Sequence, residues 1–224
     1  MRIVSLVPSV TETLSAWGVA PIACTRFCER PDLPHVGGTK DPDVEAIVAL
    51  APDLVVLDAE ENRREDHDQL VARGVALHVL RVRSLLDVAT GLAELADRVN
   101  VAWSPPRLPE PVAAQVRAFI PIWRRPWMAL GSPTYGSALL AHLGIDNVFG
   151  EEPYLSIDLA DAAARRPDAV LAPSEPYPFS TRQLPELETV APTLLVDGKD
   201  LFWWGARTPR ALERLGEVLR ELVA

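Results

Sequence analysis

The chain has 224 residues, of which 48% are hydrophobic and 24% are charged, and its formal net charge is −9. This length and composition are those of a globular protein that can bury a core as one domain or as two lobes. The negative charge argues against non-specific binding of nucleic acid, and no apolar run reaches the ~18 residues that a membrane span requires. We therefore expect a chain that neither binds nucleic acid nor spans a membrane.

Apolar runs alternate with helical patterns along the first hundred residues. Ile3–Val7 ends at Pro8 and predicts a buried strand, and Ser9, followed by Glu12, predicts the N-cap of the next helix. The remaining elements expected in this part are strands at Ile22–Cys24, Leu54–Leu57 and Ala76–Leu80 and helices at Asp43–Leu50, before Gly74, and from Ser84 to Val99. This alternation predicts a parallel α/β sheet.

A proline-rich connector follows. Four prolines lie between Pro105 and Pro111, and each lacks the N–H group that a helix interior or a central strand needs. Pro111 suits the first turn of a helix, so we expect a bridging helix at Pro111–Ile120.

The alternation then resumes. The elements expected after the connector are strands at Trp127–Leu130, Ala169–Leu171 and Thr193–Val196 and helices at Ser137–Leu143, from Ser156, and from Thr208 to the carboxyl terminus.

Two stretches repeat one pattern: Val44–Glu60 and Leu159–Glu175 each read as a short apolar helix, a Pro-Asp pair, a buried strand and a loop with a carboxylate. The repeat predicts an α/β fold of two Rossmann-like lobes with parallel sheets, joined by a single bridging helix, with a ligand cleft between the lobes. The expected divisions are an amino-terminal lobe (1–98), the connector with its helix (99–125) and a carboxyl-terminal lobe (126–224).

Ser5–Glu12 resembles the opening of the class III substrate-binding proteins, the helical-backbone metal receptors that serve ABC importers for vitamin B12, haem and iron–siderophores. Gly37–Val56 is similar to the second block of that family. Its carboxyl-terminal blocks are resembled by Leu139–Gly150, Arg166–Asp168 and Trp204–Arg210. The likeness is greatest to the cobalamin-binding branch. It implies a ligand held between two lobes without catalysis, and an ABC permease as partner. The segment Asn62–Asp66 departs from the docking loop of the family, because two arginines precede its glutamate.

Candidate ligand contacts lie where strands end, since open parallel sheets bind ligands beyond the carboxyl ends of their strands. Aromatic rings suit a large planar ligand, and an arginine fork suits a carboxylate, amide or phosphate. The candidates are Ser9, Cys24, Phe27, Cys28, Thr39, Glu60, Asn62, Tyr135, Tyr154, Tyr177, Trp203, Trp204 and Arg207. Family position favours Tyr135, Trp204 and Arg207. The expected ligand is a corrinoid, a haem or another iron chelate, and no catalytic cofactor is expected.

Alternatives remain open at this point. The chain has two cysteines, Cys24 and Cys28, which suit a cytoplasmic enzyme or a cofactor-handling protein that works through thiol chemistry. A second alternative is a haem-binding or iron–siderophore-binding protein. Among the histidines, His35 is the candidate metal ligand beside the Gly37-Gly38 turn. The sequence shows no secretory signal, which predicts a cytoplasmic protein, or a periplasmic or extracellular one if a signal precedes this sequence.

Overall fold

A computed structural model describes residues 1–223. The chain divides into two compact units. The first contains Met1–Val82, Leu86–Pro105 and the distant segment Trp204–Arg207, and the second contains Arg83–Leu85, Pro106–Trp203 and Thr208 onward. Within the described part of the chain, no helix has the length and apolar character to cross a membrane.

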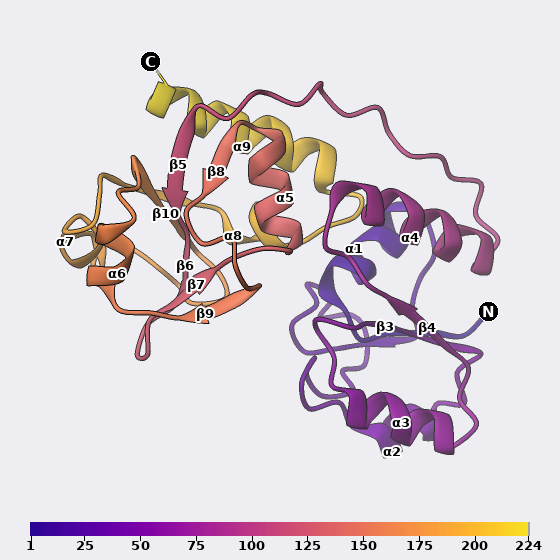
Figure 1. Cartoon of the computed structure of the whole chain (residues 1–224). Coiled ribbons are helices and arrows are strands. Elements are labelled where there is room, and N and C mark those ends of the chain that lie inside the picture. Colours follow the sequence, from indigo (N-terminus) through magenta and orange to yellow (C-terminus); the bar gives the residue numbers. More distant parts are fainter. Residues whose placement is uncertain (224) are drawn as a thin grey trace. The chain divides into compact units, whose positions relative to one another are not determined.

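The first unit is built on a parallel sheet with the strand order β2-β1-β3-β4. Its elements are β1 (Ile3–Ser5), α1 (Pro8–Ala16), β2 (Ala23–Cys24), α2 (Val44–Ala49), β3 (Leu54–Asp58), α3 (Arg64–Ala72), β4 (Leu77–Leu80) and α4 (Leu85–Arg98). Helices α2 and α3 cover one face of the sheet, and α1 and α4 cover the other (Figure 1). The central strands β1 and β3 are buried along their whole length, as strands covered on both faces must be.

The second unit has a parallel sheet with the order β11-β10-β5-β8 and a small antiparallel sheet with the order β6-β7-β9. Its elements are β5 (Val116–Phe119), β6 (Pro121–Trp123), β7 (Met128–Leu130), α5 (Tyr135–His142), β8 (Ile145–Asn147), β9 (Tyr154–Ser156), α6 (Leu159–Ala164), β10 (Ala169–Pro173), α7 (Leu184–Leu187), β11 (Thr193–Val196), α8 (Gly198–Phe202) and α9 (Thr208–Val223). The α/β fold with parallel sheets is thus confirmed. Strands β2, β1, β3 and β4 correspond in order to β8, β5, β10 and β11.

The predicted repeat is visible at the level of single hydrogen bonds. The Asp53 carboxylate accepts a 2.6 Å bond from the backbone N–H of Arg2, just before β1, and Asp168 accepts a 2.7 Å bond from that of Arg117 in β5. In return, the backbone N–H of each aspartate donates to the carbonyl of the same arginine. Each Pro-Asp pair therefore ties the start of its own strand to the start of the neighbouring strand.

Each arginine also stabilises the end of the helix that begins the repeat, α2 or α6. Arg2 donates to the carbonyls of Leu50 and Ala51, and Arg117 donates to those of Arg165 and Arg166. Ala51 and Arg166 have φ values of 44° and 52°, so both helices end in the left-handed region. The last carbonyls of a helix have no partner within the helix and need other donors. Here the donor is the arginine side chain at the start of the neighbouring strand.

We expect Asp53→Ala to lower the free energy of unfolding by about 1 kcal/mol, because an exposed but charge-assisted hydrogen bond is lost. Asp168→Ala should have the same effect, since it removes the equivalent bond in the second unit. Urea denaturation measures both. Asp97→Ala, at an exposed position of α4, is the control and should stay within about 0.5 kcal/mol. An Asp53→Ala effect no larger than the control would contradict this role.

The predicted bridging helix at Pro111–Ile120 is wrong. Residues 101–115 have no regular structure, and the chain runs between α4 and β5 without helical turns (Figure 1). The backbone N–H groups of Val112 and Gln115 donate to the carbonyls of residues 142 and 144. In a helix they would donate to carbonyls four residues earlier in the same stretch. Val116 and Ala118 point into the core on either side of the exposed Arg117, which is the two-residue period of a strand. Pairing with β8 and β10 on both sides overrides the helix propensity of this stretch.

Two smaller expectations are also wrong. Ser9 is not an N-cap, because α1 begins at Pro8 and the cap position is occupied by Val7, two residues before Ser9. Ser156 does not begin a helix but ends strand β9, which pairs with β7. The helix begins at Leu159 instead, behind a capping box formed by Asp158 and Asp161.

Candidate functional site

The carboxyl edge of the first sheet is held together by one buried side chain, Asn62. Its Nδ2 group donates to the carbonyls of Leu6 (3.2 Å) and Thr39 (2.9 Å), and its Oδ1 accepts from the backbone N–H of Asp58 (2.9 Å). These bonds join the loops that follow β1 and β3 to the Gly37-Gly38-Thr39 turn. Asn62 and Thr39 were predicted as ligand contacts. The structure shows them fixing the edge of the sheet, and a ligand role for either remains a prediction.

Asp58 lies beside Asn62, at the last position of β3, and is buried. Its Oδ1 accepts from the backbone N–H groups of Glu60 (2.8 Å) and Glu61 (3.2 Å), whereas its buried Oδ2 has no hydrogen-bond partner. Burial raises the pKa of Asp58 to about 6, the Glu60 carboxylate adds to the rise, and the backbone donors oppose it. Glu60, a predicted ligand contact, is half-buried, and its carbonyl accepts from Lys40 (2.7 Å).

Asp58 should make stability depend on pH. Because the folded state keeps a proton on Asp58 up to about pH 6 while the unfolded chain loses it near pH 4, stability falls as the pH rises through this window. Relative to Asp58→Asn, whose side chain cannot ionise, the wild type should lose roughly 2 kcal/mol between pH 4 and pH 7. Denaturation of both proteins at each pH gives the difference, and other titrating groups cancel. A difference that stays constant with pH would contradict the raised pKa.

The thiol loop, residues 24–36, follows β2 at the same edge. Cys24 and Cys28 are both free thiols and both buried, whereas Phe27 between them is exposed, with the Arg26 guanidinium 4.9 Å from its ring centre. Of the predicted contacts in this loop, Phe27 is exposed, and its contact with a ligand remains a prediction. Ser9, in the adjoining first turn of α1, is buried, and its hydroxyl has no hydrogen-bond partner.

A segment distant in sequence completes the first unit. Ala206 donates its backbone N–H to the Thr13 hydroxyl of α1 (3.1 Å), and the Arg207 guanidinium makes two bonds, of 3.0 and 2.8 Å, to the Glu12 carboxylate. Trp204 is buried. The structure thus gives the predicted ligand contact Arg207 a role in attaching this segment to α1. Ligand binding by Trp204 and Arg207 remains a prediction.

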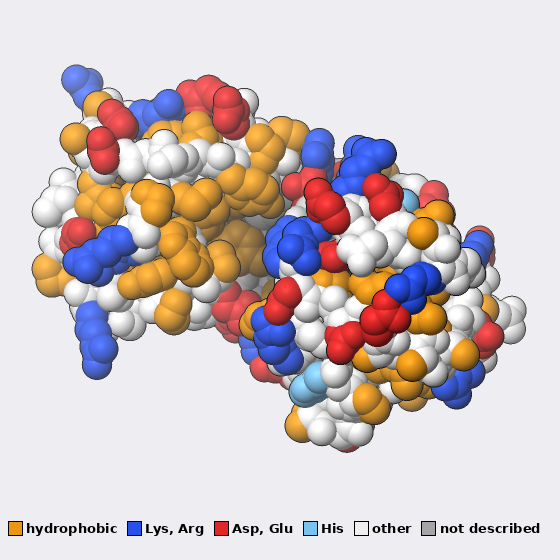
Figure 2. All heavy atoms as spheres, turned by 90° about the horizontal axis from the view of Figure 1, so that it is seen from below, with side chains coloured by type: hydrophobic (Ala, Val, Ile, Leu, Met, Phe, Trp, Pro, Cys, Tyr) orange, Lys and Arg blue, Asp and Glu red, His pale blue; other side chains and the backbone are white. Residues whose placement is uncertain are grey.

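Four aromatic rings touch one another in the second unit, and we call them the aromatic surface: Trp123, Trp127, Tyr177 and Phe179. Trp127 and Phe179 are stacked at 6.0 Å with an angle of 4° between the rings, and Tyr177 lies 4.7 Å from Phe179 and 5.7 Å from Trp123. Trp123 is 43% exposed, Trp127 and Tyr177 are half-buried, and Phe179 is buried and belongs to the hydrophobic core. Figure 2 shows hydrophobic side chains gathered over this unit. The surface can offer flat apolar contact to a planar ligand.

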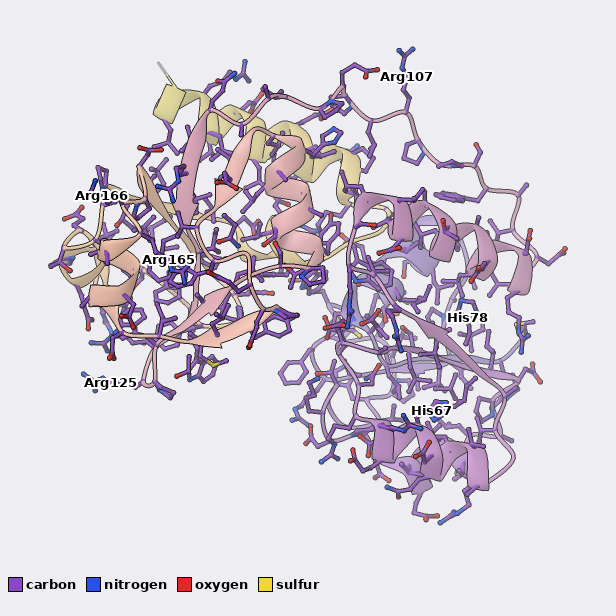
Figure 3. The ribbon with its side chains drawn as sticks, in the orientation of Figure 1. His67, His78, Arg107, Arg125, Arg165 and Arg166 are labelled. Atoms are coloured by element: carbon purple, nitrogen blue, oxygen red, sulfur yellow. The ribbon has the colours of Figure 1, made fainter. Side chains whose placement is uncertain are left out.

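Arg124 is the charged neighbour of the aromatic surface. Its guanidinium lies 6.0 Å from the ring centre of Trp127 and pairs with Glu186 at 2.8 Å. Arg125, at the turn between β6 and β7, points away from the unit (Figure 3). Of this surface, Tyr177 is among the predicted contacts, whereas Trp123 and Trp127 were not predicted. The hairpin Trp123-Arg124-Arg125-Pro126-Trp127 carried a usable signal, since two tryptophans flank a turn, but the predicted helix ended just before it.

The other predicted contacts of the second unit do not join this surface. Tyr135 is buried, and its hydroxyl hydrogen bonds to Thr208 (3.0 Å). Tyr154 is exposed on β9. The Trp203 indole donates to Glu175 (3.2 Å), with the Lys199 ammonium 5.2 Å from its ring centre. Ligand contact by these residues remains a prediction.

The histidines lie on separate elements. His67 is in α3 and His78 in β4, and Figure 3 shows them apart. His35 contacts the carbonyl of Arg30, and His142 that of Pro109. Burial lowers the pKa of His78. Among residues 1–223, no three His, Cys, Asp or Glu side chains gather in a way that could hold a metal ion.

Comparisons with known proteins agree with this architecture. Residues 3–102 match the family model of the periplasmic binding proteins. The vitamin B12-binding protein of Salmonella choleraesuis (strain SC-B67) is 25% identical over 76% of this chain and 71% of its own length. That of Pectobacterium carotovorum (strain PC1) is 23% identical over 100% of this chain and 88% of its own length.

Solved structures match over nearly the whole chain. The periplasmic vitamin B12-binding protein BtuF of Vibrio cholerae superposes with a TM-score of 0.77 at 17% identity, covering 99% of this chain and 97% of BtuF. The periplasmic heme-binding protein BhuT, in complex with two hemes, gives 0.80 at 20% identity, covering 100% and 99%. The chain therefore has the fold of the periplasmic binding proteins. The predicted resemblance to class III substrate-binding proteins is confirmed.

Proposed function

We propose that this chain is a substrate-binding protein of the ABC-importer type that holds a cobalamin or a related metal chelate without catalysing a reaction. The aromatic surface supports this function most directly. Four touching rings with an arginine at their border suit a ligand that is large, flat and polar at its edge. Relatives that are named vitamin B12-binding proteins, at 23–25% identity, favour a corrinoid.

Binding of hydroxocobalamin tests the function. We expect saturable quenching of tryptophan fluorescence, after correction for ligand absorbance, and co-elution of the ligand with the protein in gel filtration. Trp123→Ala should weaken binding at least tenfold, because it removes the most exposed ring of the aromatic surface. Trp103→Ala is the matched control: its ring packs against Trp17 in the first unit, at 5.9 Å, and its loss should change affinity less than twofold.

Haem is the second candidate, favoured by the structural likeness to BhuT, and iron–siderophores are the third. The same titration with ferric haem and with a ferric siderophore separates these ligands. If none of the three classes binds under reducing or oxidising conditions, the proposed function is refuted. The alternative of a cytoplasmic enzyme or cofactor-handling protein that uses Cys24 and Cys28 would then take its place.

An ABC permease is the partner that this function implies. In the segment Asn62–Asp66, Arg63 pairs with the buried Asp66 at 3.0 Å, and Arg64 and Glu65 are exposed. Glu65 is thus the carboxylate of this segment that is open to a permease. The function also implies a location outside the cytoplasmic membrane, as in the relatives described as periplasmic. Cell fractionation decides between that location and the cytoplasm.

A further inference from the structure

Cys24 and Cys28 are held close together by the backbone of the thiol loop. Cys24 is fixed on both sides, because it pairs with Ser5 of β1 and its N–H and carbonyl bond to Pro34 and Val36. The N–H of Cys28 then donates to the carbonyl of Thr25 at 3.1 Å. This bond closes a four-residue turn, which folds Cys28 back toward Cys24. Each thiol then lies near enough to shift the pKa of the other.

Two threonine hydroxyls complete the surroundings of Cys28. The Oγ1 atoms of Thr11 and Thr25 lie 3.2 and 3.3 Å from its sulfur. The hydrogen bond from Cys24 and those from both threonines lower the pKa of Cys28 to about 6, although burial opposes them. The pKa of Cys24 is raised, because it donates to Cys28 and is buried. One sulfur is therefore a thiolate at neutral pH and its neighbour is a thiol.

Burial limits what can reach this pair. Cys24 is fully buried, and Cys28 is only 6% exposed. A small oxidant can approach Cys28, whereas a bulky electrophile cannot. The chain has no other cysteine, so any disulfide within it must join these two.

We propose that Cys24 and Cys28 form a reversible oxidation site for small hydroperoxides, with Cys28 as the attacking sulfur and Cys24 as the resolving sulfur. The Cys28 thiolate attacks one peroxide oxygen, the O–O bond breaks, and the departing hydroxide or alkoxide takes up a proton. Cys28 is then a sulfenic acid. Cys24 attacks its sulfur, the S–O bond breaks, and the leaving hydroxide takes the Cys24 proton to form water. The two sulfurs lose two electrons, and these reduce the peroxide to water and an alcohol, or to two waters.

The test is to treat the reduced full-length protein with hydrogen peroxide. We expect the intact mass to fall by about 2 Da, for the two hydrogens lost, and free thiols in the denatured protein to fall from two to none per chain. Dithiothreitol should restore both thiols. Alkylation of Cys28 by iodoacetamide should follow an ionisation midpoint near pH 6, well below that of an ordinary thiol.

Variants separate the two roles. Cys28→Ser should abolish the reaction with peroxide, and Cys24→Ala should let a sulfenic acid accumulate, seen as a gain of about 16 Da in intact mass. Thr25→Val, which keeps both sulfurs and the side-chain shape, should shift the alkylation midpoint upward and slow oxidation. Two free thiols after a molar excess of peroxide, in the folded wild type, would overturn the proposal. So would an intact mass of Cys24→Ala that peroxide leaves unchanged. None of these measurements involves a ligand, so the result is independent of the proposed binding function.

Discussion

Replacing Asn62 by alanine is expected to lower the free energy of unfolding by about 4 kcal/mol. The substitution removes the partners of three backbone groups, the N–H of Asp58 and the carbonyls of Leu6 and Thr39. Asn62 is itself buried, so water cannot replace these bonds without opening the edge of the sheet. A buried polar group left without a partner costs about 1–3 kcal/mol, and three such groups account for the expected loss.

Urea denaturation measures this loss. Gln69→Ala is the matched control, because it removes an amide side chain from an exposed position of the next helix, α3, and should stay within about 0.5 kcal/mol of the wild type. Hydrogen exchange gives a local measure: the amide of Asp58 should lose protection in Asn62→Ala and keep it in the control. A loss of stability below about 1 kcal/mol would mean that water reaches these groups in the native protein.

The second large effect is expected for Gly205→Ala. A Cβ atom at this position would lie 2.2 Å from the Thr13 hydroxyl oxygen, and the φ of Gly205 is +116°, which non-glycine residues rarely adopt. The hydroxyl cannot move aside easily, because it donates to the Ser9 carbonyl (2.8 Å) and accepts from the N–H of Ala206 (3.1 Å). Steric conflict and backbone strain together should cost about 3 kcal/mol.

The two causes can be separated. Adding Thr13→Ala to Gly205→Ala removes the clash but leaves the backbone strain, so the double variant should recover part of the lost stability relative to Thr13→Ala alone. Gly150→Ala is the control, since a Cβ there meets nothing within 4 Å. If Gly205→Ala is as stable as Gly150→Ala, the close approach of Trp204–Arg207 to α1 is not required for folding.

The first unit was predictable from the sequence because its signals are local. The apolar runs Ile3–Val7 and Leu54–Leu57 are bounded by proline or charged residues. The structure places β1 within the first run, and β3 covers the second run and Asp58. The Pro-Asp repeat was also recognisable, although the bonds from Asp53 and Asp168 to the neighbouring strands depend on pairing that no local pattern contains.

The second unit was predicted less well, for two physical reasons. Strands β6, β8 and β9, which were not predicted, have three residues each, too few to show a clear two-residue period. Their stability comes from partners distant in the sequence, such as β7 for β9. The same dependence hid the aromatic surface, since Trp123 and Tyr177 are brought together only by folding. Conversely, Tyr135 and Asn62 were predicted as ligand contacts because they lie near strand ends. In the structure both are buried, and their side chains form hydrogen bonds within the protein.

The grouping of Trp204–Arg207 with the first unit has a consequence for attempts to divide the protein. A fragment that stops at Pro105 would leave Glu12 without its arginine and the Thr13 hydroxyl without the N–H of Ala206. A fragment made of residues 106–223 would carry those groups as an unattached loop. Two separately expressed halves should therefore recognise each other through this loop, and the chain is a natural candidate for fragment complementation, with reassembly of the Glu12–Arg207 pair as its signature.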